Sequence, residues 1–378
     1  MTLEHLGLSD WPFRIVPSRE YARFLADRTM FRQDLVKMMH KLSRRSQSSM
    51  HLLWSWFGAG KTHSLLYLAN QCEIDYPAFL PVYTEFPRDS QSFLSVFRAF
   101  ANSYDLDTLV RLYLEVATAP SMGDLNKLVP RNLANALTIY ITGQPRQQQI
   151  AQRWLKGERV PISTLREIGI DQNIDSVEAV LSFVKAVVYM WATVIRAYKS
   201  THGRIIWVLD EYQRIEKLPR AIRLQINDGL QATFNSCPDY LTIILSFGGK
   251  PQASFPEWLG PELADRIGIE PVLVLPPLIA EEAMLFVENV LSNFRPDGFD
   301  KNIYFPYTEG SVRRIIDIIR ERAELKPRYI MQFFEAVLEE ADTAIKHGQI
   351  KEISPAFAAQ ALEGRMTLLK KVEETEDP

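Results

Sequence analysis

Glycine, lysine and threonine residues stand together in the segment Ser55 to Thr62, which reads SWFGAGKT. Gly58 and Gly60 allow successive backbone N–H groups to turn inward around an anion. Lys61 supplies a positive charge for the outer phosphates of a nucleotide, and the Thr62 hydroxyl is a ligand for Mg²⁺. The pattern therefore predicts a phosphate-binding loop that holds ATP and Mg²⁺.

The neighbouring sequence supports this interpretation. An apolar run at 51–54 precedes the loop and predicts a strand, and the apolar spacing after Thr62 predicts a helix. A simple glycine-rich turn before a helix would not require lysine and threonine at these positions. Ser55 stands where the usual motif has glycine, which is a departure from it. The predicted nucleotide contacts are Ser55, Gly58, Ala59, Gly60, Lys61, Thr62 and His63, with a helix-surface position as the alternative for His63.

Two adjacent acids follow a second apolar run, RIIWVL, which predicts a buried strand over 204–209. Asp210 is placed to hold Mg²⁺, and Glu211 is placed to orient and deprotonate a water molecule. A strand that ends in two acids is common by chance, so the interpretation depends on the phosphate-binding loop. Together, the two motifs predict hydrolysis of ATP rather than binding alone.

Three polar residues outside these motifs are further candidates. Ser246 ends the predicted strand 241–245, where its hydroxyl would sense the γ-phosphate or simply cap the strand. Arg328 opens an apolar-striped helix and would reach back to the γ-phosphate, or lie in solvent at the helix start. By resemblance to AAA+ ATPase rings, Arg266 would act as an arginine finger that reaches the nucleotide of a neighbouring subunit. Its alternative is a local salt bridge with Glu262 or Asp265.

The order of predicted elements is that of an α/β fold. Strands are expected at 51–54, 79–83, 204–209, 241–245 and 272–275, although Pro81 weakens the second one. Helical spacing dominates 90–200, with turns at Ala119-Pro120 and around Gly143 and Gly157, and helices return after residue 280. We predict a lead-in over 1–50, a core over 51–275 with a helical insertion at about 90–200, a helical lid over 276–366 and a charged tail over 367–378.

Composition excludes several classes of protein. The chain has 378 residues, of which 47% are hydrophobic and 24% charged, as in ordinary globular proteins. Its two cysteines are too few for a disulfide framework, and no stretch predicts a signal peptide or a membrane span, so a cytoplasmic location is expected. The formal charge of −3 gives no overall electrostatic case for binding nucleic acid.

With these motifs, the chain resembles the AAA+ P-loop ATPases of the branch that includes origin-recognition initiators, ExeA-like ATPases and regulators of transposition. The resemblance also rests on HLGLSDWPF and LADRTMFRQDL before the loop, and on FPYTEGSVRRIID and LKPRYIMQFFEAVLEEADTAI near the end. It implies a parallel-sheet core, a carboxyl-terminal helical lid, and an adenine pocket lined by Val16, Pro17 and Arg28. A narrower resemblance, through RWLKGERVPISTLREIGI and WVLDEYQRIEKLPRAIRLQI, is to ATP-binding proteins of BREX-type phage-exclusion systems.

Two functions are candidates, and the resemblances imply the first of them, whereas the acidic charge balance favours the second. The first is an ATP-hydrolysing switch that forms a homo-oligomer with ATP and acts on DNA with a nuclease, methylase or transposase, in a mobile element or an antiphage system. The second is an ATP-dependent protein-interaction scaffold or sensor without DNA contact. The long insertion and the lack of a winged helix after the lid depart from the initiators, which argues against sequence-specific DNA reading by this chain alone.

Overall fold

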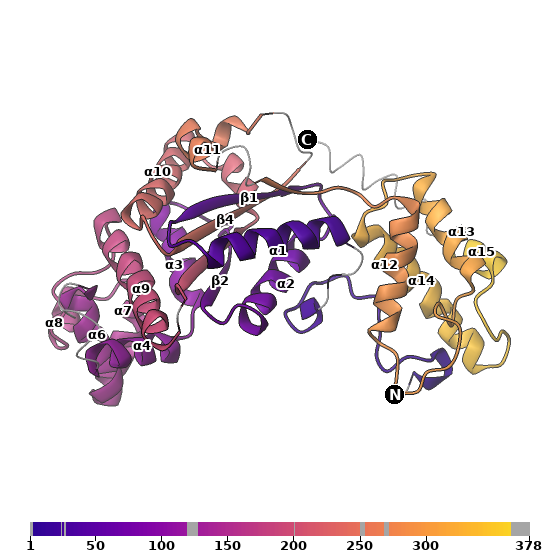
Figure 1. Cartoon of the computed structure of the whole chain (residues 1–378), viewed down its shortest axis with the longest axis horizontal. Helices are drawn as coiled ribbons and strands as arrows, with labels where there is room; N and C mark the ends of the chain where they lie inside the picture. Colours follow the sequence, from indigo (N-terminus) through magenta and orange to yellow (C-terminus); the bar gives the residue numbers. More distant parts are fainter. Residues whose placement is uncertain are drawn as a thin grey trace. The chain divides into compact units, whose positions relative to one another are not determined.

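The computed structural model describes residues 3–23, 25, 28–118, 128–199, 201–249, 254–267 and 272–363 (Figure 1). The chain divides into two compact units, and each is described by itself. Unit 1 comprises Met1–Gln33, Ser55–Tyr67 and Leu275–Pro378, and unit 2 comprises Asp34–Trp54 and Leu68–Val274. The turn predicted at Ala119-Pro120, part of the segment LADRTMFRQDL and the predicted tail lie outside the described residues.

A parallel sheet of five strands forms the centre of unit 2, which confirms the predicted fold class. Its order is β2-β3-β4-β1-β5. The strands are β1 (Ser49–Ser55), β2 (Phe79–Glu85), β3 (Arg204–Asp210), β4 (Leu241–Gly248) and β5 (Val272–Leu275). Every predicted strand is present. Pro81 is tolerated because β2 lies at an edge of the sheet, where a missing N–H donor can face away from the ladder.

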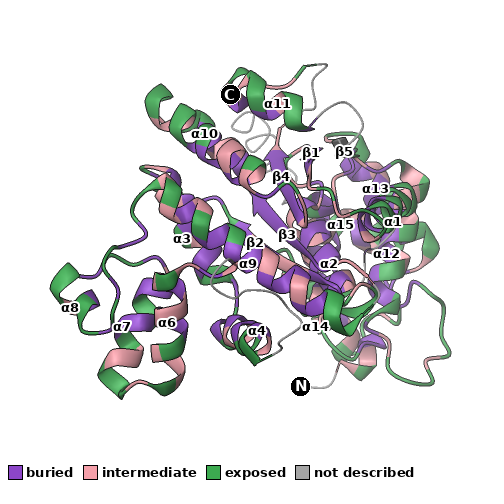
Figure 2. Cartoon of the chain, turned by 60° about the vertical axis from the view of Figure 1, so that its left-hand side comes forward, coloured by how far each residue is buried: buried purple, intermediate pink, exposed green. Residues whose placement is uncertain are grey.

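Helices cover the strands of unit 2. The predicted insertion contains α3 (Phe93–Ser103), α4 (Leu106–Thr118), α6 (Arg131–Thr142), α7 (Pro145–Leu155), α8 (Ile162–Arg166) and α9 (Val177–Tyr198). α3 packs against β2 and α9 against β3, while α10 (Arg220–Ser236) packs on both helices. Figure 2 shows the buried strands beside these helices, whose exposed faces point away from the sheet. α11 (Pro261–Ile267) follows β4 in the chain.

By length and composition, α9 could cross a membrane, but 61% of its most apolar stretch is buried. It also contacts β3, α4 and α10. α9 is therefore the central helix of this part of the core, since burial against protein explains its apolar character.

Unit 1 contains the carboxyl-terminal helices, grouped together in Figure 1. They are α12 (Ala280–Ser292), α13 (Glu309–Arg320), α14 (Pro327–Lys346) and α15 (Pro355–Glu363). The amino-terminal segment joins the same hydrophobic core through Leu6, Leu8 and Phe13. The Phe13 ring lies 5.5 Å from that of Phe334 in α14. The amino-terminal segment and the carboxyl-terminal helices thus share one hydrophobic core.

Two helices pass from one unit to the other. α1 (Thr29–Ser43) leads from the amino-terminal segment toward β1, and α2 (Lys61–Ile74) begins directly after the glycine-rich loop. α2 was predicted from the apolar spacing after Thr62.

Candidate functional site

The glycine-rich loop has the backbone that its sequence requires. Gly58 and Gly60 have φ of 77° and 95°, a region that other residues enter only with strain. The N–H of Ala59 donates to the Trp56 carbonyl at 3.2 Å, which closes a tight turn. Lys61 is the first residue of α2 and is only 6% exposed. Backbone N–H groups at a helix start, beside a lysine, form a fitting cradle for phosphate.

Ser55 is fully buried at the end of β1, and its hydroxyl donates to the Trp56 carbonyl at 3.2 Å. Among the described residues other than glycine, only Glu211 and Tyr240 have a positive φ. Ser55 therefore takes a conformation open to any residue. This explains why the chain tolerates serine where the usual motif has glycine.

The start of α14 lies against the loop within unit 1. The backbone N–H of Arg328 donates to the Gly58 carbonyl at 3.2 Å. A β-carbon added at Gly58 would lie 3.2 Å from the Arg328 β-carbon. Arg328 is otherwise exposed. The helix that was predicted to carry a γ-phosphate sensor is thus fastened to the phosphate-binding loop.

Arg28 also contacts the loop. Its guanidinium donates to the carbonyl of Ala59 at 2.9 Å and to that of Pro276 at 2.7 Å, and the residue is only 8% exposed. It joins the loop to the segment that leads into α12. Val16 and Pro17, the other residues assigned to the adenine pocket by resemblance, are exposed. Their contact with the base stays a prediction.

The carboxylate of Asp210 is held by three donors in unit 2. Its Oδ1 accepts from the Ser246 hydroxyl at 2.7 Å and from the Glu211 backbone N–H at 2.8 Å. Its Oδ2 accepts from the Tyr83 hydroxyl at 2.9 Å. Asp210 is 1% exposed, so these contacts replace the water it would otherwise bind. Such a fixed carboxylate suits a metal ligand.

Tyr83 is a site residue that the sequence did not reveal. Burial, and then the Asp210 carboxylate, raise the pKa of its hydroxyl, so the hydroxyl keeps its proton and donates. The Ser246 hydroxyl likewise donates its single proton in the hydrogen bond to Asp210. It could donate to a phosphate oxygen only after breaking that bond.

Glu211 has a left-handed backbone, with φ of 59°. Strain of this kind persists in proteins where the surrounding structure imposes it, and it concentrates at functional sites. The Gln213 amide donates to its Oε2 at 3.0 Å, and an Arg214 nitrogen lies 3.6 Å from the same oxygen. The candidate base is therefore held in one orientation.

The order of strands in the sheet relates the elements that carry these residues. β1, which leads into the loop, and β3, which ends at Asp210, are separated in the sheet only by β4, which carries Ser246. The carboxyl ends of parallel strands lie at one edge, which is the usual ligand-binding edge of an α/β sheet. No described residues form a cluster of three or more histidine, cysteine or acidic side chains that could hold a metal by themselves.

Arg266, in α11, is exposed and forms no ion pair with another described residue. The predicted alternative, a salt bridge from Arg266 to Glu262 or Asp265, is therefore not formed.

Thr62 and His63 lie in the first turn of α2, and both are partly exposed. Trp54 is buried, and its ring centroid lies 5.9 Å from that of Phe247, so Trp54 belongs to the core.

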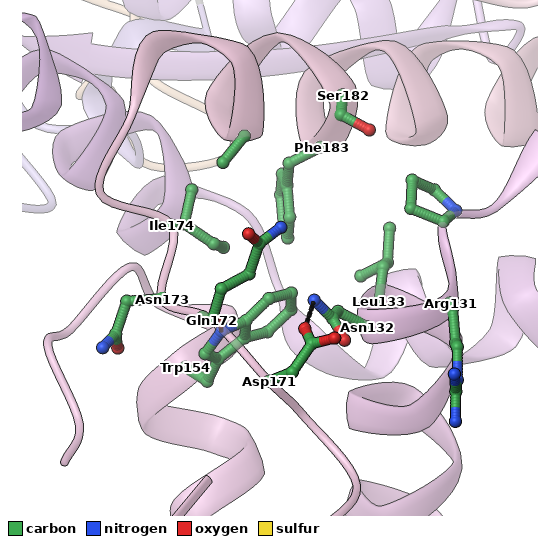
Figure 3. A pocket seen from close by; sticks show the side chains of 12 residues that line it. Arg131, Asn132, Leu133, Trp154, Asp171, Gln172, Asn173, Ile174, Ser182 and Phe183 are labelled. Atoms are coloured by element: carbon green, nitrogen blue, oxygen red, sulfur yellow. Dashed lines mark hydrogen bonds between the residues drawn. The ribbon is translucent and has the colours of Figure 1, made fainter. Parts of the chain in front are cut away.

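A cavity of about 270 Å³ lies elsewhere, in the helical insertion (Figure 3). Trp154, Leu133 and Phe183 form its apolar part, and the amide of Asn132 donates to Asp171 at 2.7 Å beside them. None of the predicted site residues lines it.

No family model matches the sequence, and no curated protein matches it. Solved structures do match the fold. The ORC1 protein of Aeropyrum pernix in complex with DNA is similar with a TM-score of 0.50 and 14% identity, over 93% of this chain and 69% of that one. Cdc6p from Pyrobaculum aerophilum is similar with a TM-score of 0.47 and 14% identity, over 96% of this chain and 70% of that one. A Walker-type ATPase of Pyrococcus abyssi is similar with a TM-score of 0.48 and 12% identity, over 97% of this chain and 79% of that one.

The first of these similarities and the parallel sheet agree with the resemblance drawn from the motifs. The likeness to phage-exclusion proteins stays a prediction. This chain therefore shares the parallel-sheet α/β fold of the A. pernix ORC1 protein.

Proposed function

We propose that this chain binds ATP and Mg²⁺ and hydrolyses ATP as a molecular switch. The observation that carries the proposal is the Asp210 carboxylate, which is buried and held by three donors at the end of β3. A buried carboxylate that neighbouring donors fix in place at the end of a strand is a suitable ligand for a cation. The glycine loop follows β1 of the same sheet, as ATP binding requires.

Each group then has a role. The Gly58 to Thr62 backbone and Lys61 hold the phosphates, while Thr62 and Asp210 hold Mg²⁺. When bound, Mg²⁺ neutralises charge on the phosphate oxygens. Glu211 orients the attacking water and takes its proton.

The helical lid, which includes α14, would change its position in response to bound nucleotide. α14 is fastened to the loop at Gly58, so a nucleotide that moves the loop moves this helix and the core that contains the amino-terminal segment. Arg328 would contact the γ-phosphate, and Ser246 would sense it through Asp210. Binding and hydrolysis would shift the protein between two states, provided that ATP and ADP have different affinities for them.

The first candidate output is action on DNA as a homo-oligomer, together with a nuclease, methylase or transposase. The solved A. pernix ORC1 protein is in complex with DNA, which supports this proposal at the level of fold similarity. It predicts an ATPase rate that DNA stimulates and that salt suppresses steeply. The antiphage or mobile-element setting belongs to this proposal.

The second candidate is an ATP-dependent protein scaffold or sensor without DNA contact. The formal charge of −3 favours it, because DNA binding depends on positive charge. Its ATPase rate would ignore DNA and respond to a partner protein.

A Lys61→Ala variant tests the shared part of both proposals. It should lose ATP binding in a titration with a fluorescent ATP analogue, while Glu211→Gln should bind ATP normally and lose turnover. Equal ATP affinity in the wild type and Lys61→Ala would refute the assignment of the loop. Adding duplex DNA over a range of salt concentrations then separates the two outputs.

A further inference from the structure

The side-chain amide of Gln213 connects the candidate base to the end of β4. Its Oε1 accepts from the backbone N–H of Gly248 at 2.8 Å. Its Nε2 donates to Glu211 Oε2 at 3.0 Å. Gln213 is only partly exposed and lies in the short 3₁₀ helix η4 (Tyr212–Lys217), directly after Glu211.

The orientation of this amide follows from chemistry. The Gly248 N–H can only donate, so the amide oxygen must face it. The NH₂ group then faces Glu211, whose ionised carboxylate only accepts. Turning the amide over would place donor against donor and acceptor against acceptor. Both contacts therefore favour the same arrangement.

Arg214 is less suited to hold Glu211. Its guanidinium lies 2.6 Å from Glu85 Oε1 and donates to the Phe86 carbonyl at 2.9 Å. Its distance to Glu211 is 3.6 Å, beyond the usual range for a hydrogen bond. Glu85 thus takes the closer contact. The amide of Gln213 makes the shorter and better-formed contact with the base.

We propose that Gln213 is a positioning residue for Glu211, an inference that rests on the proposed ATP hydrolysis. Glu211 has a left-handed backbone and a long side chain with several rotatable bonds, so its carboxylate needs an anchor to stay aimed at a water. Gln213 provides that anchor. β4 then holds both acids, Asp210 through the Ser246 hydroxyl and Glu211 through Gly248 and Gln213.

Two substitutions of Gln213 distinguish the effects of its two hydrogen bonds, one to Gly248 and one to Glu211. Gln213→Glu keeps an oxygen for the Gly248 N–H but replaces the donor to Glu211 with a like charge. Gln213→Met removes both contacts at similar volume. Each should lower kcat by about tenfold or more, as expected for loss of a hydrogen bond to a charged group. ATP affinity should change by less than about twofold, because Gln213 does not touch the nucleotide in this proposal.

The control is Gln152→Glu, which adds the same charge at an exposed position of α7. It should leave kcat unchanged. Thermal unfolding of all variants, with and without ATP, confirms that each one is folded. A Gln213→Glu variant that is folded and retains wild-type kcat would overturn the proposal.

A double-mutant cycle with Glu211→Gln gives a result that a purely structural role would not. If Gln213 acts through the base, Gln213→Met should have no further effect on the residual single-turnover rate of Glu211→Gln. The same fold loss in both backgrounds would also refute the positioning role. Wild-type protein that fails to hydrolyse ATP, with Lys61→Ala indistinguishable from it, would instead refute the proposed function itself.

Discussion

The backbone N–H of Arg328 donates to the carbonyl of Gly58, so the first turn of α14 is joined directly to the phosphate-binding loop. The two residues are far apart in the sequence but belong to the same compact unit. A lid attached in this way needs no separate linkage to respond to nucleotide. Changes at either residue should therefore affect both ATP binding and the stability of the lid.

Substitution of Gly58 by alanine tests this joint. The new β-carbon would lie 3.2 Å from that of Arg328, on a backbone with φ of 77°. We expect ATP affinity to fall by about tenfold or more, since the loop must shift to relieve the contact and the strain. Titration with a fluorescent ATP analogue measures the change.

Gly298→Ala is a matched control. Gly298 has φ of 76°, but an added β-carbon there meets no atom within 4 Å. It should cost a similar amount of backbone strain and leave ATP affinity unchanged. If both variants bind ATP like the wild type, the loop does not need its conformation at Gly58.

Arg28 should matter for stability as well as for nucleotide binding. Arg28→Met leaves the buried carbonyl of Ala59 without its donor, which costs about 1–3 kcal/mol. Urea unfolding should show a loss of this order. Arg32→Met, at an exposed position of α1, is the control and should change stability little. Unchanged stability with an altered preference between ATP and GTP would instead favour the adenine-pocket role.

The Tyr83 hydroxyl should support turnover through Asp210. Tyr83→Phe keeps the ring and removes the hydroxyl that donates to the carboxylate. We expect kcat/KM for MgATP to fall by about tenfold, the value of one hydrogen bond to a charged group. Tyr113→Phe loses a comparable hydroxyl contact to Thr138 in the helical insertion and should retain full activity. Equal activity of both variants would show that Asp210 does not depend on Tyr83.

His51 predicts how stability depends on pH. Burial, and then the charges of Lys41 and Arg204, lower its pKa to about 4 from an ordinary value of 6.5. The unfolded chain therefore binds a proton there at higher pH than the folded one, so stability is full above about pH 6.5 and falls as the pH drops toward 4. The loss is on the order of 3 kcal/mol. Urea unfolding of the wild type and His51→Gln over this range measures it, and parallel curves would contradict the assignment.

The local parts of the site could be predicted from the sequence. Gly58, Gly60 and Lys61 lie within a few residues of one another, and the strand that ends at Asp210 is a continuous apolar run. Motifs of this kind depend on short-range geometry and on burial, both of which the order of residues expresses. Parallel pairing then follows from the alternation of strands and helices.

The supporting contacts could not be predicted in this way. Tyr83 and Asp210 are 127 positions apart, and only the pairing of β2 with β3 brings them together. The Arg28 contact with Ala59 likewise depends on how the chain folds back on itself. Sequence patterns report which residues are buried, but not which polar partner each of them meets.

Arg266 allows a test of assembly, because it is exposed and is not engaged by the neighbouring acids that the structure describes. If it completes the site of a neighbouring subunit, Arg266→Ala and Glu211→Gln should each abolish hydrolysis alone. A mixture should regain activity, since some interfaces then combine an intact Glu211 with an intact Arg266 from the neighbour. Steady-state ATPase assays over a range of mixing ratios measure this recovery. Size-exclusion chromatography with ATP serves as the control that mixed oligomers form. Mixed oligomers without recovered hydrolysis would exclude the finger, and Arg266 would then be a surface residue of α11.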